Sequence, residues 1–199
     1  MSFLTDRTET DVITFEGYEI RIDTSYDTIL RVYELQEEAI FDDAEKLGIT
    51  YEMLVPNHEQ YPFDTYKQIA EVVRLAFDLL SGGKSGSDGE SFIDFEHDAE
   101  RIYASFLRDY DIDLQKEQGR MSWSKFIALI NTLSDDAPLM KAVGYRAMKI
   151  PTEKEVGKKE RDRLVKLKKA YELPSQKVKR EKEVLAYMEK RLKSHENMV

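Results

Sequence analysis

Apolar side chains recur at helical spacing in the stretch from Asp94 to Leu133. Steps of three and four residues up to Tyr110 predict one face of an amphipathic helix. Ser122 then stands where an N-cap is expected, ahead of a second apolar face. We interpret the stretch as two helices packed through aromatic residues, with the only tryptophan, Trp123, between them. The apolar positions are Phe95, Ala99, Ile102, Tyr103, Phe106, Leu107 and Tyr110 in the first helix, and Trp123, Phe126, Ile127, Leu129, Ile130 and Leu133 in the second.

Near the N-terminus the pattern changes to the alternation of a β-hairpin. Apolar and polar side chains alternate over residues 11–22, and Glu16 and Gly17 lie between the two halves. This arrangement is typical of two antiparallel strands joined by a tight turn. A lone hairpin is only marginally stable in water, so we expect it to pack on helices or to join a partner's sheet.

Helical periodicity returns directly after the hairpin. Thr24 or Ser25 is expected to cap a helix that extends past Ile40 towards Gly48. Residues 48–62 contain glycine, proline and asparagine and are expected to form a loop, with a short turn around residues 51–54 as a further option. The pattern therefore predicts one long helix and a loop in this part of the chain.

The most apolar helix is expected from Phe63 to Leu80. Gly82 and Gly83 are expected to end it, because glycine adopts the left-handed conformation common at helix C-termini. Residues 81–91 are polar and rich in glycine and serine, which predicts a flexible loop.

Further helices are expected at the C-terminal end. A short one is expected over residues 139–150. Thr152 and Glu155 have the spacing of a capping box for a helix that ends near Leu173. A last helix is expected over residues 175–193, with the first serine as its cap. The chain is thus predicted to be mainly α, a helical domain with a small N-terminal β-hairpin and a charged helical C-terminal extension.

Charge divides the sequence into two parts. Residues 1–150 carry 15 Lys and Arg against 30 Asp and Glu, whereas residues 151–199 carry 15 against 9. We therefore predict an acidic helical domain over 1–150 and a basic helical tail over 151–199. The acidic body argues against nucleic acid as the main partner. The tail could contact phosphates, although its interspersed acids favour a solvated helix surface or a protein-binding arm.

The two tail helices carry only thin apolar stripes, too narrow for a globular core. Such stripes suit an antiparallel helical pair or a helix that awaits a partner. The candidate partner-binding residues are Leu164, Leu167, Tyr171, Leu185, Met188 and Leu192.

Near-motifs for nucleotide or calcium binding are incomplete. Residues 83–85 read Gly-Lys-Ser but lack the earlier glycine and strand of a phosphate-binding loop. Asp109, Asp111 and Asp113 begin like a calcium loop, but Leu114 and Arg120 occupy the positions of the required glycine and glutamate. These three aspartates are more readily explained as the end of a helix than as a calcium site.

The sequence indicates no catalytic, cofactor-binding or metal-binding residue. The chain has no cysteine, which fits a reducing cytoplasm, and none of its apolar runs approaches the ~18 residues of a membrane span. The N-terminus lacks the features of a secretion signal. Acidic residues are numerous enough to leave a catalytic carboxylate pair open, yet no spacing singles one out. No pattern pairs the histidines, which are His58, His97 and His195. We expect a binding or assembly protein rather than an enzyme.

Several of these stretches together resemble the bacteriophage "gene product fifteen" family. The similarity covers most of residues 1–173 and is strongest over residues 92–150. It rests on Asp94-Phe95-Glu96, Asp98-Ala99, Ile102-Tyr103-Ala104-Ser105-Phe106, Tyr110-Asp111-Ile112-Asp113-Leu114, Trp123-Ser124-Lys125-Phe126, Ala128-Leu129-Ile130, Gly144-Tyr145-Arg146 and Tyr171-Glu172-Leu173.

The resemblance implies a tail-module protein of siphophages and prophages, in the host bacterial cytoplasm. Genes of this family typically lie between those for the major tail protein and the tape-measure protein, where tail assembly chaperones are encoded. The implied partners are the tape-measure protein and the tail-tube protein, with self-association as a further option. No membrane and no cofactor are implied. The alternatives are a structural virion component, such as a connector or tail-completion protein, and an enzyme or nucleic-acid regulator that uses the basic tail.

Overall fold

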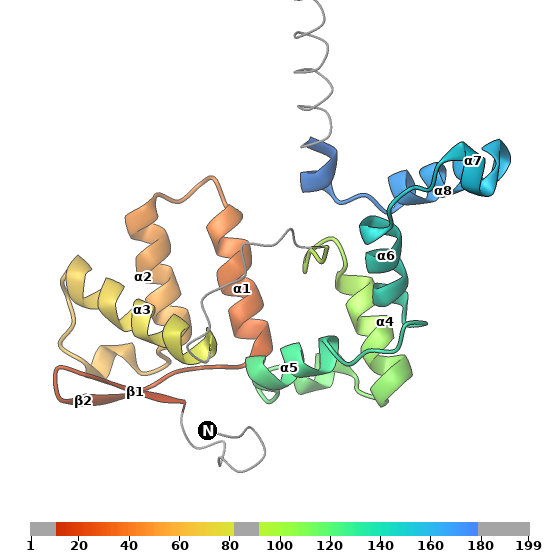
Figure 1. Ribbon diagram of the computed structural model, residues 1–199. Helices are drawn as coiled ribbons and strands as arrows, with labels where there is room; N and C mark the ends of the chain where they lie inside the picture. The colour runs from red at the N-terminus through yellow and green to blue at the C-terminus, as the bar shows by residue number, and fades with distance from the viewer. Residues whose placement is uncertain (1–10, 82–91, 179–199) are drawn as a thin grey trace, which may run out of the picture. The chain divides into compact units, whose positions relative to one another are not determined.

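The computed structural model describes residues 11–81 and 92–178, and all structural statements below concern these residues (Figure 1). Their secondary structure is mainly helical, with a single two-stranded antiparallel sheet in the described ranges. The prediction of a mainly α fold with a small N-terminal hairpin is confirmed.

The chain packs into two compact units, which we describe separately. Unit 1 contains described residues 11–81 and 106–133, and unit 2 contains described residues 92–105 and 134–178. The division that charge predicts after residue 150 lies inside unit 2, and it stays a prediction.

Unit 1 begins with the expected hairpin of β1 (Val12–Phe15) and β2 (Tyr18–Arg21). The two turn residues have φ of 48° and 83°, the positive values that a tight turn between twisted strands requires. Ile13 pairs with Ile20, and both side chains are buried. The hairpin therefore turns one apolar face towards the core of unit 1, as expected for strands too short to be stable alone.

Helices α1 (Tyr26–Glu37) and α2 (Asp43–Leu54) form a hairpin-like pair (Figure 1). The expectation of one long helix followed by a loop is wrong here. Asp42 caps α2, because its carboxylate accepts hydrogen bonds from the backbone at residues 44 and 45, and Glu45 bonds back to the backbone N–H of Asp42. This capping box starts a new helix within the polar stretch. Gly48 lies inside α2 and marks no boundary.

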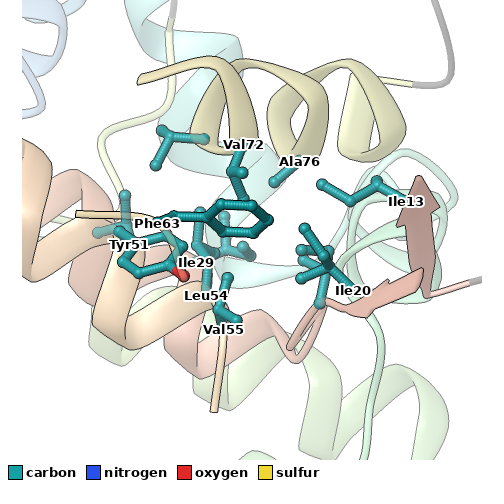
Figure 2. Packing of buried hydrophobic residues seen from close by; sticks show 12 residues of the cluster. Ile13, Ile20, Ile29, Tyr51, Leu54, Val55, Phe63, Val72 and Ala76 are labelled. Carbon is teal, nitrogen blue, oxygen red and sulfur yellow. The ribbon is translucent and has the colours of Figure 1, made fainter. Parts of the chain in front are cut away.

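A short 3-10 turn, η1 (His58–Gln60), leads to helix α3 (Tyr66–Ser81). The helix predicted from Phe63 is thus confirmed with a later start, whereas its glycine C-cap and the loop over residues 82–91 lie outside the described residues. Side chains of the hairpin, α1, α2 and α3 meet in one apolar cluster (Figure 2). Its labelled members are Ile13, Ile20, Ile29, Tyr51, Leu54, Val55, Phe63, Val72 and Ala76.

The remaining part of unit 1 holds the predicted aromatic packing. Helix α4 (Ala99–Tyr110) contributes its second half to unit 1, and α5 (Trp123–Ile130) follows the 3-10 turn η2 (Leu114–Glu117). Phe106 and Phe126 stack with ring centroids 5.3 Å apart, and both are fully buried. The pairing of the two helices through aromatic residues is confirmed, although α4 begins five residues later than predicted.

Trp123, at the start of α5, stacks on Phe126 with ring centroids 5.6 Å apart. Its ring is half-buried and lies 5.7 Å from the ring of Tyr33 on α1. The centre of the aromatic packing is Phe126, which also stacks on Tyr26 at 4.8 Å. The predicted cap of α5 is confirmed, because the Ser122 hydroxyl accepts a hydrogen bond from the backbone of residue 125.

Unit 2 contains the first half of α4 together with α6 (Pro138–Ala147), α7 (Glu153–Val156) and α8 (Lys158–Ala170). The predicted capping box at residues 152–155 is present, but the single long helix predicted after it is wrong. Gly157 breaks it with a φ of 76° and a ψ of 157°. A further helical turn begins with Pro174 at its first position, one residue before the predicted cap.

Candidate partner-binding surface

A buried ion pair holds unit 2 together. The guanidinium of Arg146 on α6 donates hydrogen bonds of 2.5 Å and 2.8 Å to the two carboxylate oxygens of Asp98, just before α4. Both side chains have 0% exposure. Such a two-pronged contact fixes orientation as well as distance, since both groups are planar.

Arg146 also donates hydrogen bonds to the backbone of two chain segments that have no regular secondary structure. Its Nε donates to the backbone oxygen of Tyr171 at 2.6 Å, and Nη1 donates to the backbone oxygen of Phe92 at 2.9 Å. Four hydrogen bonds therefore satisfy this buried cation, as burial of a charge requires. The entry to α4, helix α6 and the end of α8 all meet at one side chain.

The carboxylate of Asp98 remains charged in this setting. Burial by itself would raise its pKa, but hydrogen bonds from Arg146 and from the backbone of Asp94 hold the pKa below its ordinary value. Arg101 adds a further hydrogen bond of 2.9 Å from the solvent side. The pair is thus an ionised, structural anchor.

Two aromatic rings lie beside this anchor. The ring of Tyr171 stacks on Tyr145 with centroids 4.9 Å apart, and the guanidinium of Arg101 lies 5.6 Å from the centre of the Tyr171 ring. An arginine at this distance is attracted by the ring's electrons. The half-buried Tyr171, a predicted partner-binding residue, therefore has its orientation fixed by unit 2 itself.

The other predicted partner-binding residues have different positions. Leu164 and Leu167 are half-buried on α8. Leu185, Met188 and Leu192 lie outside the described residues. The structure thus brings only Tyr171 into contact with the anchor, and binding by this set stays a prediction.

Helix α6 presents an apolar hollow that the sequence interpretation missed. The cavity measures about 430 Å³ and we call it the α6 hollow. It is lined by Asp135, Met140, Lys141, Val143, Gly144, Tyr145 and Met148. Residues 140, 143, 144 and 148 have the spacing of one helix face, a signal that was present in the sequence. The opposite face of α6 carries the buried Leu139, Ala142 and Arg146. The anchor therefore holds one side of this helix while its methionine-rich side stays open.

A second hollow, of about 280 Å³, lies in unit 1 and is mainly polar. Among its lining residues, Asp23 accepts hydrogen bonds of 2.9 Å from the backbone of Ser25 and from the Thr28 hydroxyl. The Asp23 carboxylate therefore stabilises the N-terminal end of α1. Elsewhere in the described ranges, no group of three His, Cys, Asp or Glu side chains is placed to hold a metal ion. Asp113, from the incomplete calcium pattern, caps η2 instead.

The comparison with protein families decides the identity of the chain. The profile described as bacteriophage Gp15 protein matches residues 5–173. The chain belongs to the bacteriophage Gp15 protein family. It is accordingly a phage structural or morphogenesis protein, and the predicted extent of the resemblance, up to residue 173, agrees with the match. Searches of curated proteins and of solved structures gave no match.

The family match includes all three segments that meet at the anchor. Phe92, Asp98, Arg146 and Tyr171 all lie within it, as does the α6 hollow. No helix in the described part of this Gp15 protein has the length and apolar character to cross a membrane.

Proposed function

We propose that this Gp15 protein is a tail assembly chaperone that binds the tape-measure protein and recruits tail-tube subunits in the cytoplasm of the host bacterium. The observation that carries the proposal is the α6 hollow, an apolar surface on the side of α6 that does not carry the buried anchor, within the family-matched residues. The proposal assigns the protein binding steps and no catalytic step.

The chemistry of the α6 hollow suits an apolar helix. Met140 and Met148 are flexible and polarisable, and methionine-rich surfaces adapt to partners of differing shape. Gly144 opens the middle of the face, because a Cβ built there would meet nothing within 4 Å. An amphipathic helix can place its apolar stripe in such a groove.

The proposed partner, the tape-measure protein, has apolar surfaces that must be covered before the tail tube forms. A tape-measure chain forms long helices whose apolar stripes remain exposed until tube subunits cover them, and exposed apolar patches promote aggregation. A chaperone with a net charge of −9 keeps such a complex dispersed. Because the chaperone must later be released, each contact should be weak and many copies should act together.

Co-expression tests the proposal. The tape-measure protein encoded by the same phage is produced with and without this Gp15 protein, and its soluble fraction and co-purification are measured. Gly144→Leu fills the α6 hollow and Met148→Glu charges it, so both variants should lose the solubilising effect. Gly48→Leu is the matched control, since Gly48 also lies in a helix with open space around its Cβ.

Two results would reject the proposal. One is a soluble fraction unchanged by the wild-type protein together with no co-purification. The other is a full effect from both α6 variants, which would reject the α6 hollow as the binding surface and so remove the observation that carries the proposal. Mass spectrometry of purified particles tests the alternative role, because a structural virion component would be present in stoichiometric amount.

A further inference from the structure

The connection between α1 and α2 carries an exposed apolar tip. Ile40 is 82% exposed and its neighbour Phe41 is 38% exposed, and we call this pair the apolar tip. The connection between α1 and α2 lies at the end of this helix pair opposite the β-hairpin (Figure 1). Single exposed apolar residues are common on proteins, but two adjacent ones at the end of a loop can enter a partner's surface.

Acidic side chains surround this tip. The segment from residue 34 to residue 45 contains six acidic residues, and the basic residue next to it, Lys46, donates a hydrogen bond of 2.7 Å to the backbone oxygen of Gln36. All six are exposed: Glu34, Glu37, Glu38, Asp42, Asp43 and Glu45. A surface that accepts the tip should therefore combine an apolar floor with basic residues around it.

Unit 2 has a hollow of this kind. It measures about 170 Å³, and we call it the α8 hollow. Ile150 and Val165 supply its apolar side chains, and Lys168, Lys169 and Glu172 supply its polar ones. Small-molecule pockets usually hold about 300–1,000 Å³, so a hollow of this size suits a single side chain better than a ligand.

The helix that carries the α8 hollow is strongly basic. Seven of the residues of α8 are Lys or Arg and two are acidic. Lys168 donates one hydrogen bond to the backbone oxygen of Met148 at 2.7 Å. An ammonium group has three donors, so it can still bind a carboxylate. Lys169 is exposed at the same helix face.

We propose that copies of this protein associate head to tail, with the apolar tip of one copy seated in the α8 hollow of the next. The acidic residues around the tip then meet the lysines of the α8 hollow. The side chain of Ile40 is buried from solvent by contact with Val165 and Ile150. The tip belongs to unit 1 and the hollow to unit 2, so the contact joins two different surfaces. Contacts of this type form a ring when the rotation closes and an open chain when it does not.

The contact is small, so its affinity should be low at each step. Interfaces well below about 1,200 Å² are typical of weak, transient encounters. Repetition along a partner with many binding sites would strengthen it. This inference does not depend on the identity of that partner.

Sedimentation equilibrium of the purified full chain tests the proposal. The average mass should rise with protein concentration and fall when sodium chloride is added, because salt screens the charges. Ile40→Ser should raise the dissociation constant about tenfold, as expected for loss of one buried aliphatic side chain. Tyr66→Ser is the matched control, because Tyr66 is also exposed in unit 1, at 62%.

A charge exchange makes the test specific. Glu38→Lys and Lys169→Glu should each abolish association, since like charges then meet at the contact. Mixing these two variants should restore it, because each lysine tip then faces a glutamate hollow and each glutamate tip faces a lysine hollow. Lys154→Glu, on α7, should leave association unchanged. Circular dichroism confirms that every variant is folded.

A monomer mass at every concentration would overturn the proposal. Association that persists in both Ile40→Ser and Lys169→Glu would also overturn it, as would a mixture of the charge variants that stays monomeric. None of these three outcomes bears on the tape-measure experiment, which measures solubility of a different protein.

Discussion

Arg146 and Asp98 form a buried two-pronged ion pair within unit 2, although 48 residues separate them along the chain. Burial of two charges is costly, and their attraction offsets that cost only with good geometry and further hydrogen bonds. Both conditions hold here, because backbone oxygens satisfy the rest of the guanidinium. The pair fixes which face of α6 is buried and therefore which face carries the α6 hollow.

Removal of one member of this pair should be strongly destabilising. Arg146→Met leaves the Asp98 charge buried without its main partner, and we expect a loss of about 3–5 kcal/mol in the free energy of unfolding. Urea denaturation followed by circular dichroism measures this loss. Arg146→Met combined with Asp98→Leu should be less destabilised than the sum of the two single variants, since no lone charge remains. Additive losses would contradict the assigned coupling.

Arg101→Met is the control for this experiment. Arg101 also contacts Asp98, but its side chain is 34% exposed. Exposed ion pairs contribute about 0–1 kcal/mol, so the loss should be small. A cost equal to that of Arg146→Met would show that contact with Asp98 alone, rather than burial, sets the effect.

Acid should weaken the anchor. The pKa of Asp98 is lower in the folded protein than its ordinary value of about 3.9 in an unfolded chain. The stabilisation is therefore complete above that value and is lost as the pH falls through the lower, folded pKa. Urea midpoints at a series of acidic pH values should fall more steeply for the wild type than for Arg146→Met with Asp98→Leu. Equal slopes would contradict the prediction.

The sequence could predict structural features that depend only on residues close to one another along the chain. Alternation gave the hairpin and periodicity gave α3, and a serine placed before an apolar run gave the cap of α5. The anchor could not be predicted in this way, because its two members are far apart and nothing local marks either one as buried. Both lie in segments that carry the family resemblance, but only the fold shows that they pair.

The wrong boundaries have local causes. The apolar residues Ile40 and Phe41 continue the helical pattern, but Asp42 and Glu45 form a capping box that starts a new helix there, and Gly48 lies within that helix. Glycine inside a helix costs only about 1 kcal/mol, which packing can offset. The α6 hollow was missed for a different reason, since its spacing was visible but only the fold shows which face of α6 is covered.

Alkaline pH should test the packing of Tyr26. Burial, with a smaller effect of Asp27, raises the pKa of its hydroxyl to about 12. The hydroxyl donates a hydrogen bond of 2.6 Å to the backbone oxygen of Leu114. Because the folded state holds the proton more tightly, this stabilisation is complete below about pH 10 and is lost between about pH 10 and 12. Urea midpoints should show this loss, and Tyr26→Phe should reduce it.

Ultraviolet titration of tyrosinate gives an independent measurement of the same group. Burial also raises the pKa of Tyr33 and of Tyr51, so the wild type should show a late absorbance change to which several tyrosines contribute. Tyr26→Phe should remove one tyrosine's share of that change. Tyr66→Phe is the control for the same substitution at an exposed position, since this residue is 62% exposed. A late absorbance change of the same size in Tyr26→Phe as in the wild type would contradict the assignment.

The break between α7 and α8 should depend on glycine. Gly157 has φ 76° and ψ 157°, a region that residues with a Cβ avoid. Gly157→Ala should therefore lower the free energy of unfolding by about 1–3 kcal/mol. Gly48→Ala is the matched variant inside α2, where open space surrounds the new Cβ, and it should raise stability by about 0.5–1 kcal/mol. Thermal and urea unfolding measure both changes, and the same sign for both would contradict the backbone argument.

In the aromatic packing, the stability losses from replacing Phe126 and Trp123 should not follow the size of the two side chains. Tryptophan is the larger side chain, but Trp123 is half-buried, whereas Phe126 is fully buried between Tyr26 and Phe106. Phe126→Ala should leave a cavity and cost about 3–5 kcal/mol. Trp123→Ala should cost less, because water already reaches part of its ring and the space opens to solvent. Urea denaturation of the two variants decides the order, and a larger loss for Trp123→Ala would mean that the tryptophan, not Phe126, is the centre of this packing.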